Sequence, residues 1–523
     1  SQLSANQNRD SAVHITTCQR RADNSDNWCR LTLPDMHVKR TEQHSVHCAD
    51  ASSTAAFGQV MRLGPMDHIV VANIPIAVIF VYAQPKQDAT RLIPFARLQS
   101  ALARLLDYYP HLTGRIVLNT DDNSPEVQNI GTGANLVEAT CDAALDEIPH
   151  SGPRLKVTDL PNGGIDLLPV FEPVVGSIYP CAPLSVQHTR FACGSVALGF
   201  RVSHFMCDAD GVFQLVRDLA ELYRGGPSAH LTAPPHIRPF MSDVVRDPTA
   251  PVPPTAMFQL APSMETGGGL DLKPATGALP PPPTEGRVLR FSVTELGALK
   301  ALATDAASPS EWVSTFDALA AHLYQRIYAA RVEYALAVGA DPALLSTDML
   351  SPVNWRSADR LALPPRYFAN AVICAIFTTS PEELATAPLS RVARIVHDGL
   401  RSLTPTEATA ALHWICSQPD KRRIMQNFRY ANGGFMLSQW CKTDAYVKTD
   451  FDVDQNGQPV APLLSSTPFT PISNIDGLGY VTATEEQLTR APGETAAVDV
   501  CLALAAPIWK ILDKDPLFRR FAE

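Results

Sequence analysis

The side chain best suited to proton transfer lies in a short stretch, His204-Phe-Met-Cys-Asp208, at the end of an apolar run. An imidazole titrates near neutral pH, so it can take a proton and return it within one reaction. His204 is therefore the candidate general base. The pattern alone is weak, because 14 histidines in 523 residues should produce about one His-x-x-x-Asp by chance. A histidine hydrogen-bonded in the core is the alternative interpretation.

Other chemistries that a short motif could signal have less support. Cys207 could be a nucleophile, but its apolar neighbours favour a buried, inert thiol. Asp450-Phe-Asp452-Val-Asp454 begins like a calcium loop, yet the glycine and the bidentate glutamate that such a loop needs are both missing. The sequence contains no Gly-x-Ser-x-Gly, phosphate-loop or Cys-x-x-Cys pattern. We therefore predict no metal site and no bound cofactor.

A strand followed by a helix must position His204. Apolar residues alternate over 196–202, which is the period of a half-buried strand. Beyond the motif they recur at helical spacing from Val212 to Leu222, and Gly225-Gly226 then predicts the helix end. Ligands tend to bind at strand ends in α/β proteins, so the position of His204 is as suggestive as its chemistry.

The rest of the chain also alternates strand-like and helix-like segments, which predicts an α/β fold. We expect a buried strand within 69–82 and strands at 115–118, 165–171, 287–293 and 371–378. We expect helices at 94–109 and 388–403, and a helix that begins at a capping box at 308–311, has a second candidate start at 314–317 and continues through Ile327.

The composition limits the classes of function. A net charge of −10 and the absence of a dense Lys/Arg block argue against a nucleic-acid partner. The longest apolar run is interrupted by Asn73 and Pro75, so we predict no membrane span, and no secretory signal is visible. The 11 scattered cysteines are typical of reduced thiols. We expect a cytoplasmic protein.

Proline content divides the chain. Residues 1–55 are polar and weakly periodic, which indicates a partly irregular N-terminal extension. Residues 231–287 are so rich in proline that a long crossover is the better prediction than a compact element. Two domains, 56–230 and 288–523, would lie on either side of it, because a chain of this length exceeds a single core.

Several segments together resemble the BAHD family of coenzyme-A-dependent acyltransferases, in a fungal-type form. His204-x-x-x-Asp208 matches the family's His-x-x-x-Asp motif, although Ala209-Asp210 precede the glycine. The other matches, strong and weak, keep the family's order: Leu63–Asp67, Tyr109–Arg115, Ser351–Ser357, Leu363–Ala371, Ser438–Trp440, Asp450-Phe451, Ile475–Gly479 and Asp515–Arg519. One departure is Asp452-Val-Asp454, which stands where the family has Gly-Trp-Gly.

The resemblance implies two chloramphenicol-acetyltransferase-like domains, joined by a long crossover loop, with an active-site tunnel between them. The domain at 56–230 would carry His204 as general base. The resemblance implies that Asp208 turns away from the histidine and pairs with Arg356, as an ionised carboxylate in a core requires. Ser438 and Trp440 are candidates for the oxyanion contact.

The resemblance also implies substrates. Acyl-coenzyme A, with acetyl as the default, would donate to a natural-product alcohol or amine in a ternary complex of a monomeric enzyme. Ser314 and Thr315, at a predicted helix start, are candidates for binding coenzyme A, or Ser314 merely caps that helix. The second-motif residues Asp450 and Phe451 would be structural.

Two alternatives stay open. A condensation-type enzyme with a carrier-bound donor shares the motif, but such enzymes usually carry a doubled histidine, and Ser203 precedes His204 here. A catalytically silent homologue that binds small molecules is the non-enzyme alternative.

Overall fold

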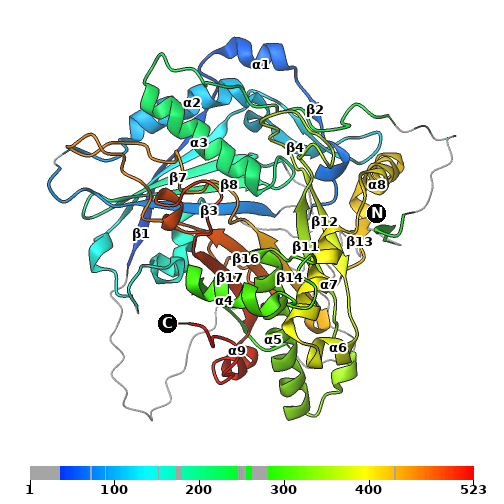
Figure 1. Ribbon diagram of the computed structural model, residues 1–523. Coiled ribbons are helices and arrows are strands. Elements are labelled where there is room, and N and C mark those ends of the chain that lie inside the picture. Colours follow the sequence, from blue (N-terminus) through cyan, green and yellow to red (C-terminus); the bar gives the residue numbers. More distant parts are fainter. Residues whose placement is uncertain are drawn as a thin grey trace, which may run out of the picture. The chain divides into compact units, whose positions relative to one another are not determined.

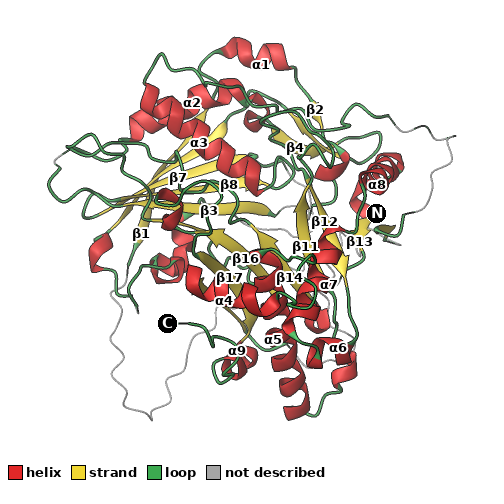
Figure 2. Ribbon diagram, in the orientation of Figure 1, coloured by secondary structure: helices red, strands yellow, loops and turns green. Residues whose placement is uncertain are grey.

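Two six-stranded sheets organise the protein. The computed structural model describes residues 36–70, 74–88, 90–150, 152–171, 180–245, 247, 249, 255–261, 281–428 and 431–522. Helices cover the sheets in the described body, which begins at Met36 (Figures 1 and 2). The predicted α/β class is confirmed.

The first sheet holds the histidine motif. Its strand order is β1-β6-β7-β8-β3-β15, with bounds Val38–Val46, Ala134–Cys141, Leu184–Phe191, Val196–Ser203, Pro75–Tyr82 and Leu464–Ser466. Helices α2 (Phe95–Tyr108) and α3 (Ala209–Gly225) share one apolar core with the alternate residues 196, 198, 200 and 202 of β8. β8 is central and buried on both faces, not half-buried as its alternation predicted.

The second sheet forms the other half. Its strand order is β10-β17-β16-β14-β11-β12, with bounds Thr284–Phe291, Val498–Ala505, Leu478–Ala483, Phe435–Gln439, Met349–Asn354 and Val372–Phe377. Its core includes residues of α4 (Val293–Ala303), α5 (Thr315–Ala337), α7 (Leu389–Arg401) and α9 (Ala506–Leu512). The expected helix at 388–403 is confirmed as α7.

Smaller elements complete the described fold. A three-stranded sheet, β2-β5-β4, comprises Met61–Arg62, Pro125–Gln128 and Arg115–Leu118, and a two-stranded sheet pairs β9 (Phe258–Leu260) with β13 (Ile424–Gln426). The remaining α-helices are α1 (Ala51–Phe57), α6 (Pro381–Thr386) and α8 (Pro405–Ser417). No described helix is both long enough and apolar enough to cross a bilayer.

The sheets are less separable than two consecutive domains would be. β15 belongs to the second half of the chain but pairs with β3 in the first sheet, Leu464 opposite Val81. The predicted extension over 1–55 contains β1, which pairs with β6, so the folded body reaches back to Met36. The predicted crossover over 231–287 contains β9 and the start of β10.

Two local predictions are wrong. Residues 165–171 form no strand, because Asn162, Gly163 and Gly164 adopt left-handed conformations that turn the chain into short 3-10 turns. Leu167 and Leu168 are buried against the face of the first sheet opposite α3. The expected helix start at 308–311 is not helical, whereas the second candidate start is correct, because Ser314 is the N-cap of α5.

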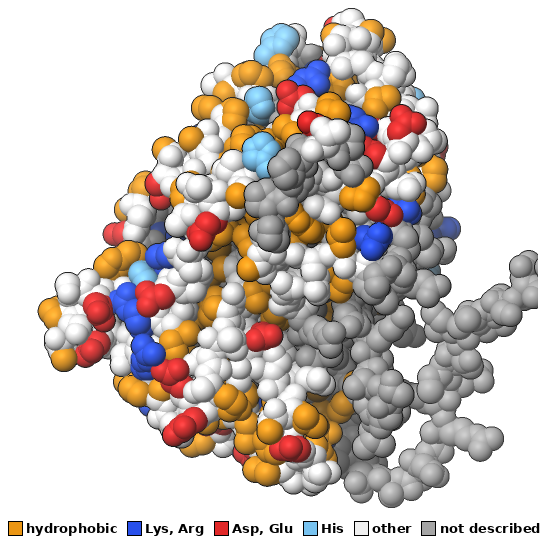
Figure 3. All heavy atoms as spheres, turned by 90° about the vertical axis from the view of Figure 1, so that its right-hand side faces the viewer, with side chains coloured by type: hydrophobic (Ala, Val, Ile, Leu, Met, Phe, Trp, Pro, Cys, Tyr) orange, Lys and Arg blue, Asp and Glu red, His pale blue; other side chains and the backbone are white. Residues whose placement is uncertain are grey.

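Charge is dispersed over one face of the protein. On the face drawn in Figure 3, the described Lys and Arg side chains alternate with Asp and Glu and form no continuous basic field. Nucleic-acid binding needs a continuous basic field, and the described side chains of this face do not form one.

Candidate active site

The turn between β8 and α3 places the histidine motif at the sheet edge. Asp208 is the N-cap of α3, and its carboxylate accepts a hydrogen bond from the Gly211 amide at 3.2 Å. A Cβ on Gly211 would come within 2.4 Å of the Phe368 carbonyl. Glycine is therefore required here, because it lets the segment that contains Asn370 pack directly on the helix start.

Asn370 determines which nitrogen of His204 is free. The two hydrogens of its Nδ2 are donated to Asp67 Oδ1 at 2.8 Å and to the His204 carbonyl at 2.7 Å. Its Oδ1 therefore faces His204 Nδ1, 3.0 Å away, and can only accept. That contact requires a proton on Nδ1, which leaves the lone pair on Nε2 for proton abstraction.

Asp67 holds Asn370 in the orientation that this contact needs. Its carboxylate also accepts from the backbone N–H of Gly64 at 2.8 Å and of Asn370 at 3.2 Å. Burial raises the pKa of Asp67 to about 7. Asp67 and Asn370 lie in two of the segments that resemble the family, but the sequence gives neither residue a role. Their positions within those segments were the only available signal, because 303 residues separate them.

The surroundings of His204 favour its neutral form. Burial lowers its pKa, and the Asp208 charge and the Asn370 hydrogen bond oppose the shift without reversing it. A neutral imidazole is the form that can act as a base. Cys207, by contrast, is fully buried, and burial raises the pKa of its thiol far above the usual value. A nucleophilic role for Cys207 has no support.

Asp208 and Arg356 form a bidentate ion pair. Arg356 Nη1 and Nη2 donate to the two carboxylate oxygens at 2.9 and 2.8 Å. The Ala371 amide donates to the same carboxylate at 2.8 Å. This arrangement joins the start of α3 to the segment after β11, and it occupies both oxygens of the Asp208 carboxylate, neither of which bonds His204.

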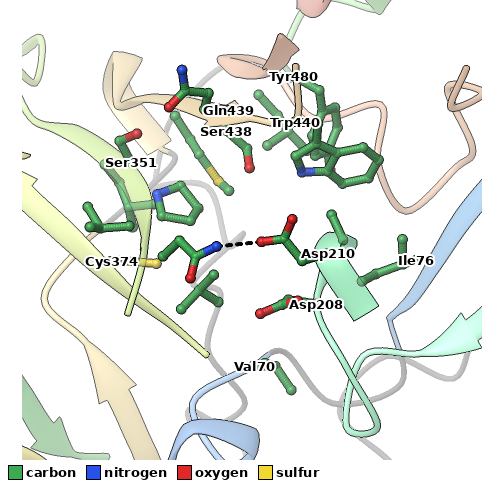
Figure 4. Close-up of a pocket in the computed structure, with 18 of the residues that line it drawn as sticks. Val70, Ile76, Asp208, Asp210, Ser351, Cys374, Ser438, Gln439, Trp440 and Tyr480 are labelled. Atoms are coloured by element: carbon green, nitrogen blue, oxygen red, sulfur yellow. Dashed lines mark hydrogen bonds between the residues drawn. The ribbon is translucent and has the colours of Figure 1, made fainter. Parts of the chain in front are cut away.

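A cavity of about 600 Å³ lies between residues of both sheets. His204 lines it together with Ile76 from β3, Leu350 and Ser351 from β11, and Ser438 from β14. This cavity lies between the two halves of the protein, where we predicted the active-site tunnel. Figure 4 shows Asp208 and Asp210 on one wall and Ser438 and Trp440 on the facing wall.

Ser438 and Trp440 present hydrogen-bond donors to this cavity. The Ser438 hydroxyl points into it (Figure 4), and neither this hydroxyl nor the Trp440 indole N–H is bonded to another described residue. Trp440 packs against Tyr480, with ring centroids 4.7 Å apart, which holds the indole in place. Both side chains are thus available to an oxygen of a substrate.

Ser314 lines the cavity as a helix cap. Its hydroxyl accepts from the Asp317 amide at 3.0 Å, and the Asp317 carboxylate accepts from the Ser314 amide at 2.7 Å. The buried Asp317 carboxylate therefore occupies the positive end of α5, where a phosphate would otherwise bind. Thr315 does not line the cavity.

Trp312 and Arg401 lie on the same side as Ser314. Trp312 is 57% exposed, and the Arg401 guanidinium lies 5.2 Å from the centre of its ring. Both line the cavity. Neither residue could be predicted from the sequence, because a tryptophan and an arginine 89 positions apart carry no joint signal.

The second-motif loop lies outside the cavity. Phe451 is buried between Tyr82 and Tyr223, and Arg224 lies 3.6 Å from the Asp450 carboxylate. Asp452, which replaces a glycine of the family pattern, accepts from the Ile93 amide at 2.7 Å and the Tyr223 hydroxyl at 3.1 Å. The loop thus joins α2 to α3.

Comparison with known sequences identifies the family. The family model described as the Transferase family matches residues 36–462. Rosmarinate synthase of Plectranthus scutellarioides is 29% identical, over 72% of this chain and 80% of that protein. Shikimate O-hydroxycinnamoyltransferase of Nicotiana tabacum is 27% identical, over 66% of this chain and 74% of that protein.

Solved structures share the fold. Vinorine synthase superposes with a TM-score of 0.62 over 91% of this chain and 96% of its own, at 16% identity. TRI101 of F. graminearum, in complex with coenzyme A and deoxynivalenol, gives 0.65 over 88% and 99%, at 18% identity. The predicted two-domain chloramphenicol-acetyltransferase-like fold is confirmed. The chain belongs to the BAHD family of acyl-coenzyme-A-dependent acyltransferases.

Proposed function

We propose that the protein transfers an acyl group, acetyl by default, from acyl-coenzyme A to a hydroxyl of a natural-product acceptor, with His204 as the general base. The observation that carries the proposal is the Asn370 contact, which reserves the Nε2 lone pair of a cavity-lining histidine. Donor and acceptor would approach through opposite ends of a tunnel, as the family resemblance implies.

The reaction follows from this geometry. Neutral His204 takes the hydroxyl proton as the oxygen attacks the thioester carbonyl. Ser438 and Trp440 stabilise the oxyanion of the tetrahedral intermediate. Its collapse breaks the carbon–sulfur bond, and the imidazolium returns the proton to the coenzyme A thiolate. The protein forms no acyl-enzyme, so both substrates must be bound together.

Acyl transfer can be tested as the release of free coenzyme A thiol from acetyl-coenzyme A in the presence of a panel of alcohols and amines. We expect release that depends on both substrates, with initial-rate lines that intersect, and products whose mass increases by one acyl group. Hydroxycinnamoyl-coenzyme A belongs in the donor panel, because relatives carry that name. An O-acyl product from an alcohol that also carries an amine would support the hydroxyl as nucleophile.

Other outcomes would favour the rival functions. Turnover with an acyl group on a carrier protein, and none with acyl-coenzyme A, would indicate a condensation-type enzyme. Binding of acyl-coenzyme A without thiol release under any condition would indicate a silent homologue. Parallel initial-rate lines with a trapped acyl-protein would contradict the proposed mechanism.

The exposed Trp312 and Arg401 are our proposal for the nucleotide end of coenzyme A. An indole face can stack on adenine, and a guanidinium is suited to phosphate. We proposed Ser314 and Thr315 for this task from the sequence. Ser314 remains a neighbour of the nucleotide in this scheme, but the Asp317 carboxylate, which also pairs with Arg401 at 3.4 Å, occupies the helix start in place of phosphate.

Replacing Trp312 by alanine should raise the KM for acetyl-coenzyme A by about tenfold and leave kcat within a factor of two. The reason is that stacking on the adenine stabilises the bound substrate and the transition state equally. The control is acetyl-pantetheine, which lacks the nucleotide and should show no difference between Trp312→Ala and the wild type. Leu344, which is also exposed and does not line the cavity, provides the matched variant Leu344→Ala. Equal losses with both donors would contradict the assignment.

A further inference from the structure

We propose that Asp210 selects acceptors that carry a positively charged ammonium group close to the reacting hydroxyl. The inference rests on the proposed function and adds a substrate class to it. Asp210 is the second residue of α3 and lines the cavity, and 37% of its side chain is exposed, compared with 5% of the Asp208 side chain. Figure 4 shows its carboxylate projecting into the pocket.

The charge of Asp210 is poorly compensated. All five N–H groups of Arg356 are in use, and two of them form the short contacts to Asp208. Asp210 receives one longer contact from Arg356, at 3.3 Å, and a hydrogen bond from the side-chain amide of Asn354 at 2.5 Å. Two carboxylates thus share one guanidinium, which leaves a net negative charge at the cavity wall.

One oxygen of Asp210 is open to the cavity. Both protein contacts use Oδ2, and no donor from the described residues bonds Oδ1. Apart from Arg356, no described Lys or Arg lies within ion-pair distance of Asp210. Arg217 acts on Asp210 only through space, and Asp444 opposes its effect. Burial and the neighbouring Asp208 raise the Asp210 pKa, because both disfavour the charged carboxylate. A cation bound beside Asp210 would offset this cost and stabilise the ionised form.

The facing wall favours an organic cation. Trp440 lies across the pocket from Asp210 (Figure 4) and is held against Tyr480. The indole N–H is the donor proposed for the oxyanion, so an alkylammonium group would contact the ring face, and the Asp210 carboxylate adds Coulomb attraction. Both residues share the cavity with His204. An ammonium bound between them would lie in the same cavity as the base and could position a hydroxyl of the same molecule for attack.

Equilibrium binding tests the inference without requiring turnover. The probes are ω-hydroxyalkyl trimethylammonium ions with two to six methylenes, each compared with the neutral alcohol in which carbon replaces nitrogen. We expect the best cation to bind the full-length wild type at least about tenfold more tightly than its neutral partner, as a carboxylate and a tryptophan acting together allow. Calorimetry measures both dissociation constants.

Two variants assign the effect. Asp210→Asn keeps the shape of the side chain, and its cation-to-neutral ratio should fall below about threefold. Asp444→Asn is the matched control, because Asp444 acts on Asp210 through space but does not line the cavity, and it should keep most of the wild-type ratio. If Asp210→Asn fails to fold, Asp210→Ser replaces it.

The inference is overturned if no wild-type cation binds more than threefold tighter than its partner, or if the Asp210 variant keeps the preference. A fall of the ratio in Asp444→Asn as large as in Asp210→Asn would also overturn it, because a general field would then be responsible. Absence of acyl transfer with every donor would refute the proposed function instead, and the binding ratios would still be readable.

Discussion

Replacing His204 by alanine should lower kcat by about 10²–10⁴-fold at saturating acyl-coenzyme A, because the general base is lost while both binding sites remain. The fold should survive. His204 Nδ1 makes one hydrogen bond to Asn370, and the other Asn370 contacts use its amide hydrogens and do not depend on the imidazole. Stopped-flow or steady-state thiol release, with thermal unfolding of the same sample, measures both effects.

The control is His413→Ala, since His413 is exposed on α8 and does not line the cavity. It should leave kcat unchanged. The wild-type pH profile adds a second check, because burial lowers the His204 pKa. Activity should rise as His204 loses its proton, through a pH below the usual imidazole value of about 6.5, and then stay level. Near-wild-type turnover in His204→Ala would contradict the mechanism.

The histidine motif and its immediate supports could be predicted because the information is local. The apolar spacing around residues 196–222 signals a strand and a helix, and the structure has β8 and α3 there. The order of the family segments predicted the two-domain fold. Gly225-Gly226 also predicted the helix end correctly, since α3 ends at Gly225 and Gly226 takes a positive φ.

The polar network could not be predicted, because it depends on contacts between distant segments. His204 and Asn370 are 166 positions apart, and Asn370 and Asp67 are 303 apart. β1 was missed for another reason. It is an edge strand whose side chains are mostly exposed, so its sequence lacks the apolar alternation that marks a strand. β15 is only three residues long and carries little pattern of its own.

Asp210 illustrates both limits. In the sequence, Ala209-Asp210 precede the glycine of the motif, and by itself this pattern indicates only a departure from the family motif. The structure gives the departure a physical meaning, because the added carboxylate meets Asn354 and Arg356 from a segment about 145 residues away. A local difference therefore became interpretable only after the tertiary contacts were known.

Replacing Asp208 by alanine should cost about 3–5 kcal/mol of the free energy of unfolding, because it leaves the Arg356 charge half-buried without its main partner. The cap of α3 and the acceptor for the Ala371 amide are lost with it. Denaturant unfolding measures the loss. Asp208→Asn keeps the cap and most hydrogen bonds, so it should cost less.

The two variants together separate an anchor from a catalytic partner. In the anchor role that we propose, turnover falls in step with stability, and Asp208→Asn retains more of both than Asp208→Ala. A carboxylate that served His204 directly would behave in another way. Asp208→Asn would then lower kcat as strongly as Asp208→Ala, with little change in unfolding. The geometry favours the first result, because Asn370 occupies His204 Nδ1 and Arg356 occupies both oxygens of Asp208.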